Sequence, residues 1–503
     1  MNLFPFRSAW IAGCLPAVFL AGCAVGPDYH APELPAQAPF RNQPLLEQRV
    51  SRLPAADMTT WWAGFGDKEL ETLVNRALAQ NLDLAQAVAR VNQARAMTTG
   101  ARSALLPSGD LNAQASRNHQ SLQDPIGQLA SASPGFDRNS SLYQVDAGAS
   151  WEVDIFGGLR RGLEAANAEQ QTAVAQQAAV RLIVTSSAAS GYIQLRTLQA
   201  RLQVVESRVK TQTDLVRLLQ LQYANGVVAR LQLKQAEGVL ATVSAQIPPL
   251  RSSIESTMNS LEVLSGVMPG ALHQELAKVT PIPVAPGIDT AGGQADMLRR
   301  RPDVIAAERT LAASNARIGQ AVADYYPKFS IGALLGSATH ASGNLLSGDA
   351  DQAQAVFGLR WRLFDFGRVK AEVEFAKGRD AQALAAYQQT LLQATADVEN
   401  AMTQLVQSEK QNAVLEDGVR SLAEARAAAF SAFQQGSVSF IEVLDADDRL
   451  QQAQEQKLLA QSAASVAAVD CFKSLGGGWN APRADVVAKA ERRRGSPDDT
   501  VEN

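Results

Sequence analysis

The chain repeats itself at long range, and this repetition restricts its possible folds more than any other sequence feature. Subtracting 210 from the residue number carries Gly436 onto Gly226. The same subtraction carries Trp361 onto Trp151. Because two distant landmarks keep one spacing, the segment between them has the same length in both halves, which is typical of an internal duplication. We therefore expect two copies of one structural unit.

A second offset relates the earlier parts of the two halves. Adding 220 carries residues 81–84 onto 301–304 and Pro107 onto Pro327. The offset falls to 210 before the tryptophans, so the first half must contain about ten additional residues. We place them in the polar, Gly- and Ser-rich segment 120–140.

The segment after each of these prolines is predicted to form a β-hairpin, at about 107–156 and about 327–366. Apolar and polar residues alternate from Tyr143 to Ile155, which is the period of a strand with one apolar face. Strands in a membrane and a soluble sandwich with one buried face explain this alternation equally well. Four strands alone would leave open edges, so insertion into lipid would require oligomerisation.

Helical patterns occupy most of the remaining sequence. The first repeat, 67–290, is predicted to contain a helix, the first hairpin, a long helix over 157–224, a turn at Gly226, a returning helix to about 265 and an equatorial loop. A heptad seam in the long helix is broken once, at Gln212. Pro248 and Pro249 should kink or interrupt the returning helix. The second repeat, 291–478, follows the same plan, with the long helix to Phe433, the turn at Gly436 and the returning helix to about 475.

The two ends of the chain differ from the repeats. Residues 1–22 resemble a signal peptide that ends in Leu-Ala-Gly before Cys23, which is typical of lipoprotein cleavage and predicts lipid attachment at Cys23. The alternatives are lipid attachment at Cys14, which also follows an Ile-Ala-Gly segment, and an ordinary signal followed by an incidental cysteine. Residues 23–66 are Pro- and Ala-rich without periodicity, which predicts an extended arm, and 479–503 are charged and predicted to be disordered.

Composition excludes several classes of function. The formal net charge of -4 gives no basic surface for nucleic acid, so no nucleic-acid partner is expected. The four histidines lack metal-ligand spacing, and no nucleophile motif or phosphate-binding loop is present. We therefore expect neither catalysis nor a metal site, and no cofactor apart from the covalent lipid on Cys23.

A set of short motifs, in this order and spacing, resembles the outer-membrane factor family of TolC-like ducts, and most closely its lipoprotein branch in multidrug efflux. The motifs are Cys23 with Pro-Asp-Tyr at 27–29, Trp-Trp at 61–62, Trp151 to Gly157, Arg-Arg-Pro-Asp at 300–303, Tyr-Pro at 326–327, Val-Leu-Asp-Ala at 443–446 and Leu-Gly-Gly-Gly-Trp at 475–479. The resemblance implies a mixed, mainly α fold and a homotrimer. Each protomer would contribute four transmembrane strands to a 12-stranded barrel and long helices to a periplasmic α-barrel.

The resemblance also implies a function. The protein would be a passive trimeric duct of the Gram-negative outer membrane, anchored by palmitate on Cys23. It would carry small toxic compounds or drugs from an inner-membrane pump, of the resistance-nodulation-division type, through a periplasmic adaptor (membrane fusion) protein. Outer-membrane lipid would surround the strands. The alternatives are a duct for protein secretion or metal export, and a lipid-anchored coiled-coil envelope scaffold, which would not explain the hairpins.

In this family the second helical turn lines a periplasmic aperture with carboxylates, and the matching residues here are Glu442 and Asp445, with Phe433 beside them. Val438 replaces the Arg that the best-known duct uses to latch this aperture, so Gln232 and Lys234 are considered as possible latch contacts instead. Acidic residues also occur at helix starts because they complement the helix dipole, which would explain both carboxylates without a gate.

Overall fold

The computed structural model forms two compact units, each assembled from separate parts of the chain. The strand unit comprises residues up to Ala31, Gln93–Gln170 and Arg309–Leu384; the helical unit comprises Pro32–Asn92, Gln171–Glu308 and residues from Ala385 onward. The structure describes residues 24–32, 40–44, 46, 54–288, 293–345 and 347–480. The predicted signal peptide, Cys23 and nearly all of the predicted tail lie outside these described residues.

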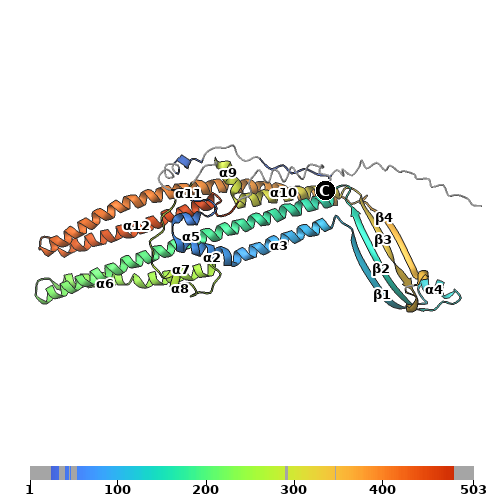
Figure 1. The fold of residues 1–503 in the computed structure, drawn as a ribbon, viewed down its shortest axis with the longest axis horizontal. Helices are drawn as coiled ribbons and strands as arrows, with labels where there is room; N and C mark the ends of the chain where they lie inside the picture. The colour runs from blue at the N-terminus through green and yellow to red at the C-terminus, as the bar shows by residue number, and fades with distance from the viewer. Residues whose placement is uncertain are drawn as a thin grey trace, which may run out of the picture. The chain divides into compact units, whose positions relative to one another are not determined.

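Two hairpins form one antiparallel sheet in the strand unit (Figure 1). Within the described residues this sheet has four strands in the order β1-β2-β3-β4, with bounds Ser108–His119, Asn139–Val153, Lys328–Thr339 and Asp351–Arg360. The alternating sequence explains the strands, because successive side chains point to opposite faces. The duplicated fold with two hairpins, expected from the offsets, is confirmed.

The additional residues of the first half lie between β1 and β2. They include a short helix, α4, Pro125–Ser131, which the polar composition of the segment did not predict. Its start is fixed locally, because Pro125 occupies the first turn and the Asp124 carboxylate accepts from the N–H of Gly127 at 2.5 Å. The insertion therefore contains a folded segment between β1 and β2.

Two helices of 67 residues each follow the hairpins: α5, Gly158–Ala224, and α11, Arg368–Gln434. Shorter helices precede the hairpins: α2, Lys68–Gln80, and α3, Leu82–Ser103, in the first repeat, and α9, Gly293–Arg300, and α10, Pro302–Ala323, in the second. The absence of proline from both long segments permits their length. No described helix combines the length and apolar character needed to cross a membrane.

The returning helices differ between the repeats. In the first repeat α6, Arg230–Ser244, and α7, Ile247–Leu264, replace one continuous helix, because Pro248 and Pro249 follow the break. In the second repeat α12, Phe440–Ser474, is uninterrupted. The connection after α7 contains one further helical turn, α8, His273–Leu276.

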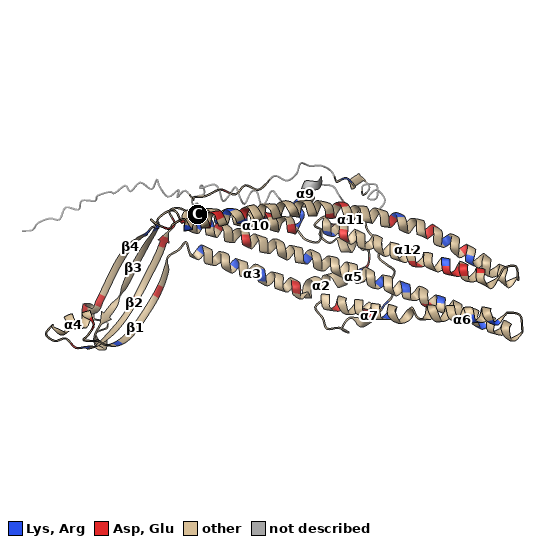
Figure 2. Cartoon of the chain, turned by 180° about the vertical axis from the view of Figure 1, so that it is seen from behind, with Lys and Arg blue, Asp and Glu red and all other residues tan. Residues whose placement is uncertain are grey.

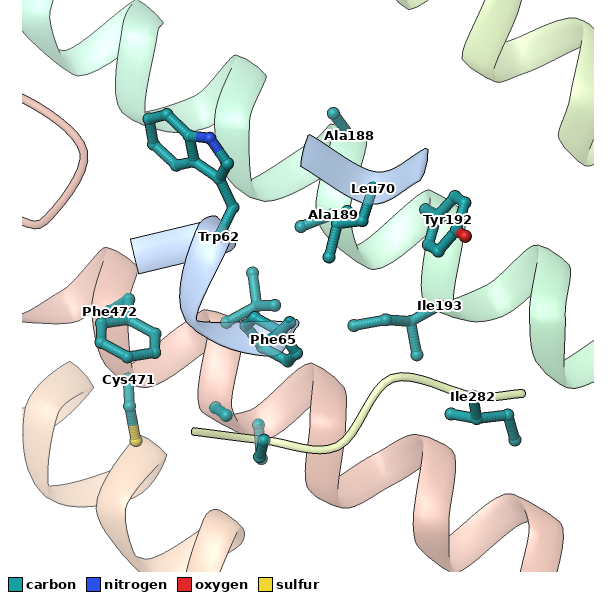
Figure 3. Packing of buried hydrophobic residues seen from close by; sticks show 14 of the residues in the cluster. Trp62, Phe65, Leu70, Ala188, Ala189, Tyr192, Ile193, Ile282, Cys471 and Phe472 are labelled. Atoms are coloured by element: carbon teal, nitrogen blue, oxygen red, sulfur yellow. The ribbon is translucent and has the colours of Figure 1, made fainter. Parts of the chain in front are cut away.

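Residues 61–65, at the end of the segment 23–66 that the sequence predicts as an extended arm, lie in the main hydrophobic core of the helical unit. Residues Trp61–Phe65 form a 3-10 helix, η1, whose aromatic side chains are buried. The Trp61 ring stacks on Phe472 of α12 with centroids 5.2 Å apart. Figure 3 shows Trp62 and Phe65 beside Phe472 and residues of α5. Burial of these large aromatic side chains drives the segment into the core, although its sequence has no helical or strand period.

A buried arginine ties three segments of the helical unit together beside this core. Arg196 of α5 is fully buried and pairs with Glu69 of α2 at 2.6 Å. The same guanidinium donates to the carbonyl of Leu276 at 3.2 Å and lies over the Tyr192 ring. Desolvation raises the pKa of Tyr192 to about 12, so its hydroxyl stays protonated and donates to Asp67.

Candidate functional site

The candidate site is the end of the helical unit where the two long helices reverse. The first reversal joins α5 to α6 at Gly226. The N–H of Gly226 donates to the carbonyl of Tyr223 at 3.0 Å, and the N–H of Val227 donates to that of Gln222 at 2.9 Å. This pair of bonds is a Schellman motif, which satisfies the last free carbonyls of a helix.

The second reversal joins α11 to α12 at Gly436 and has the same geometry. The N–H of Gly436 donates to the carbonyl of Phe433, and the N–H of Ser437 donates to that of Ala432, both at 2.9 Å. The φ angles of Gly226 and Gly436 are 72° and 75°, in the left-handed region that glycine adopts without strain. Both turns therefore have the same backbone geometry.

The two reversals pack on one another through a small hydrophobic cluster, which we call the tip cluster. Its buried members are Leu215, Val216, Leu219, Leu233, Ala236, Phe440 and Val443. Phe433 is half-buried and packs against Phe440, with ring centroids 5.6 Å apart. Phe433 thus contributes to the packing of the second turn within the protomer.

The two predicted aperture carboxylates are exposed on the first turns of α12. Glu442 lies in the first turn itself, where its charge complements the helix dipole. Asp445 pairs with Arg449 one turn further along at 2.9 Å, with 58% and 67% of these side chains exposed. Both carboxylates remain accessible to solvent and to ions.

The two possible latch residues have partners within α6 and its N-terminal cap. The Gln232 side-chain oxygen accepts from the N–H of Ala229 at 3.0 Å and so caps the start of α6. Lys234 pairs with Glu237 on the same helix. In the protomer both side chains therefore stabilise α6, and their part in a latch stays a prediction.

A buried polar network, which the sequence reasoning missed, joins α12 to both long helices. We call it the Asp447 network. The Asp447 carboxylate accepts from the Gln212 amide of α5 at 2.8 Å and lies 3.4 Å from Arg426 Nε of α11. Arg208 of α5 lies 3.9 Å from Asp447 and 3.5 Å from Asp448. Only 15% of the Asp447 side chain is exposed, so water screens these charges weakly.

One sequence signal could have located this network. Gln212 interrupts the apolar seam of α5, and Gln212 itself is only 1% exposed in the structure. A buried amide in such a seam requires a polar partner, and its partner is Asp447. Figure 2 shows that acidic residues gather on α12 toward the second turn. The partner helix could not be inferred, because the contact spans more than two hundred residues.

The contacts of the Asp447 network are not repeated at the equivalent positions of the other repeat. The repeat equivalents of Asp447 and Arg426 are Glu237 and Val216, and Leu422 takes the place of Gln212. Val216 belongs to the tip cluster, so the same helical position carries an apolar contact in one copy and a charge in the other. Within the described residues no group of His, Cys, Asp or Glu side chains is arranged to hold a metal ion.

Comparisons with known proteins agree with this architecture. The chain is 29% identical over 442 residues to the pyoverdine export outer membrane protein OpmQ of Pseudomonas putida, covering 86% of this chain and 91% of OpmQ. It is 28% identical to the solvent efflux pump outer membrane protein SrpC of Pseudomonas putida, covering 92% and 97% of the two chains. The solved outer-membrane channel OprN superimposes with a TM-score of 0.80 at 29% identity, over 91% of this chain and all of OprN.

The match to a known family covers both repeats of the chain. The sequence profile of the outer membrane efflux protein family matches residues 73–267 and 295–477. The first match ends after α7 and the second after α12, so each contains one hairpin and one glycine turn. The chain belongs to the outer membrane efflux protein family.

Proposed function

We propose that the chain is the outer-membrane channel of a tripartite efflux system, a passive homotrimeric duct that carries small toxic compounds or drugs out of the cell. The observation that carries this proposal is the match of both repeats to the outer membrane efflux protein family. Relatives named for solvent, toluene and pyoverdine export support a small-molecule cargo. The duct would have no catalytic role.

The exposed faces of the sheet support a membrane location for the strands. Large apolar side chains of β1, β3 and β4 are exposed in the protomer, among them Leu111, Leu335, Phe357 and Leu359. These four side chains occupy the odd-numbered face, while the even-numbered face of β2 carries Gln144, Asp146 and Glu152. Lipid would cover the apolar face, and a water-filled lumen would hydrate the polar face. Three copies would close the sheet and remove its edges.

The lipid anchor at Cys23 is part of this proposal. The support comes from the signal-like segment that precedes the cysteine. Acylation there would attach the amino terminus to the outer membrane. The helical unit would then extend into the periplasm, where an adaptor protein could reach the turns of α5 and α11.

The proposed partners are a periplasmic adaptor and an inner-membrane pump of the resistance-nodulation-division type. The relatives support this assignment because several are named as outer membrane proteins of efflux pumps. In the trimer, Glu442 and Asp445 would form carboxylate rings around the periplasmic aperture, with Phe433 packed behind them. Three copies of each carboxylate about one axis would raise the local negative potential and favour cations.

The Asp447 network would hold α12 against α5 while the aperture is closed. Asp447 accepts from Gln212 of α5 and pairs with Arg426 of α11, so α12 cannot move away from these two helices without breaking charged hydrogen bonds. Each such bond contributes about 1.5–3 kcal/mol. This network provides the protomer with a restraint on α12 that needs neither Gln232 nor Lys234.

The decisive experiment measures ion conductance and cell resistance with the same full-length protein. Purified protein in planar bilayers should give discrete conductance steps. Deletion of the gene should sensitise cells to toxic organic compounds, and a plasmid copy should restore resistance. An elongated particle without conductance would favour the coiled-coil scaffold instead. Conductance with unchanged drug sensitivity would favour a duct for protein secretion or metal export.

A further inference from the structure

The first described residues of the chain are bound to the strand unit, just beyond the end of β2. The N–H of Val25 donates to the carbonyl of Phe156 at 3.1 Å. A Cβ atom at Gly157 would lie 2.7 Å from the Cα atom of Ala24, so a side chain there would displace the segment. The chain that directly follows Cys23 is therefore held at the base of the first hairpin.

A buried arginine holds this segment by its backbone carbonyls. Arg161 lies in the first turn of α5, and only 6% of its side chain is exposed. Its Nε donates to the carbonyl of Val25 at 3.2 Å. One terminal nitrogen donates to the carbonyl of Gly26 at 3.4 Å and to the Asp28 carboxylate at 2.7 Å. The other donates to Glu164 at 2.8 Å. Since a buried guanidinium needs acceptors for its N–H groups, the segment supplies acceptors that Glu164 alone could not.

Close contacts with α10 hold the other side of the segment. Gly26 has a φ of 95°, and a Cβ atom there would lie 2.4 Å from the Cα atom of Gly319. The half-buried Tyr29 side chain packs on a cluster of small residues, Ala168, Ala312 and Ala313. We call residues 25–29 together with Arg161 and Gly319 the amino-terminal clasp. The clasp therefore binds the segment through its backbone, one glycine and one aromatic ring.

The equivalent place in the second repeat shares the backbone of the clasp and lacks its arginine. Gly367 is equivalent to Gly157, and the φ angles of the two glycines are 88° and 80°. A Cβ atom at Gly367 would nevertheless meet no heavy atom within 4 Å. Ala371 stands at the position of Arg161. The duplicated fold thus forms without this arginine in one copy, which indicates that Arg161 serves the amino-terminal segment.

We propose that Arg161 is a positioning residue that clasps residues 25–29 and so holds the acylated Cys23 at the base of β2. Ala24 alone separates Cys23 from the clasp, so the lipid stays beside the strands. This inference rests on the proposed lipid anchor. It adds the place where the anchor is held and the side chain that holds it.

The clasp distinguishes the two cysteines that the sequence offers for lipid attachment. Attachment at Cys14 would place residues 15–24 between the lipid and the clasp, and such a tether would let the lipid enter the membrane at varying distances from the strands. Attachment at Cys23 keeps the lipid and the strands in one patch of membrane, because a short connection gives a high effective concentration. The clasp therefore favours Cys23.

The contacts of the clasp should contribute unequally. Arg161 donates to three groups of the segment and is buried, so water competes weakly for these bonds. The Asp28 side chain is 80% exposed, and an ion pair screened by water adds little. Loss of the Arg161 side chain should therefore release the segment, and loss of the Asp28 carboxylate should only loosen it.

Chymotrypsin cleavage after Tyr29 in the full-length acylated protein, purified in detergent, tests the clasp. The protease must draw the chain out of its binding site, so the cleavage rate follows the population of the released segment. Mass spectrometry of the released fragment gives this rate and shows which cysteine carries the lipid. The wild type should release the lipid-bearing fragment 23–29 slowly. Arg161→Ala should release it at least about tenfold faster, because several hydrogen bonds to a charged group are lost together.

Gly26→Ala releases the segment by a second route and leaves Arg161 in place. The added Cβ atom would collide with Gly319, so cleavage should again be about tenfold faster. Gly135→Ala is the matched control, because Gly135 also has a positive φ, 88°, but faces open space. A second control, Arg317→Ala, removes the ion pair that joins α10 to Glu169 of α5. Both controls should be cleaved at the wild-type rate.

The outcomes separate the clasp from the anchor and from the duct. A wild-type cleavage rate in Arg161→Ala would overturn the clasp, and so would equal acceleration in Arg317→Ala, which would indicate general loosening of the strand unit. If Arg161→Ala does not fold, the rate of Gly26→Ala against Gly135→Ala decides in the same way. A fragment that begins at Cys14, or that carries no lipid, would overturn the anchor at Cys23. Bilayer conductance of the same wild-type preparation tests the duct separately.

Discussion

The two glycine turns share one backbone and carry different side chains. Both close with the same pair of Schellman hydrogen bonds, and their glycines differ by 3° in φ, 72° against 75°. A Cβ atom at Gly226 or Gly436 would meet no heavy atom within 4 Å. The duplication has therefore preserved the geometry of the reversal, and any functional difference must come from neighbouring residues.

The second turn differs from the first at two equivalent positions, where it carries a buried aromatic side chain and a carboxylate that contacts other helices. Phe440 at the start of α12 is buried in the tip cluster, and its equivalent Arg230 is exposed. Asp447 contacts two other helices, while its equivalent Glu237 pairs along its own helix. This difference supports the proposal that the second turn, and not the first, lines the aperture.

Truncation of the buried aromatic should give the largest difference between the turns. Phe440→Ala removes a large side chain from the tip cluster and should lower the local free energy of opening by about 3–5 kcal/mol. Arg230→Ala, at the equivalent exposed position, should change it by less than about 0.5 kcal/mol. Hydrogen exchange of the backbone amides at each turn measures both values. Equal losses would contradict the comparison.

Removal of the Asp447 carboxylate should have the next largest effect. Asp447→Ala leaves Gln212 without its partner and Arg426 without its counter-charge, which should cost roughly 1–3 kcal/mol. Glu237→Ala removes an exposed pair on one helix and should cost about 0.2–0.5 kcal/mol. Exchange rates along α12 and α6 report the two variants. If Asp447→Ala leaves α12 as protected as the wild type, the network does not restrain this helix.

Substitution of the two turn glycines should lower the stability by the same amount in both repeats. Gly226→Ala and Gly436→Ala should each cost about 1–2 kcal/mol, because an L-residue is strained in the left-handed region. The two costs should agree, since both sites have free space for a Cβ atom. Thermal unfolding of the two single variants provides the test. A marked difference would mean that the turns are not equivalent in solution.

Sequence reasoning succeeded where the duplication provided an internal comparison. The offsets of 210 and 220 located both glycine turns, both hairpins and the insertion in the first half. Gly226 and Gly436 were recognisable because only glycine adopts a left-handed turn without strain. Comparing two copies within one chain replaced the alignment of separate sequences.

Sequence reasoning failed where a contact joins distant segments. Residues 61–65, at the end of the predicted extended arm, pack in the core because Trp61 stacks on Phe472, a partner that no local pattern identifies. The Asp447 network was missed for the same reason, although Gln212 gave a local signal that a buried polar partner existed. Local periodicity determines where helices and strands form, but it does not determine which polar side chains meet.

Substitution of the two carboxylates of the proposed aperture should have the smallest effect on stability. Glu442 and Asp445 are exposed, so alanine at both positions should change stability by less than about 0.5 kcal/mol. The matched control is Gln232→Ala with Gln235→Ala at the equivalent positions of the first turn.

The reversal potential of these two double variants in planar bilayers, under a potassium chloride gradient, tests the central claim most directly. The account predicts that Glu442→Ala with Asp445→Ala reduces the preference for cations, because rings of negative charge are lost, and that the glutamine control matches the wild type. An unchanged cation preference in the acidic variant, or an equal change in both variants, would contradict the assignment of the second turn as the aperture.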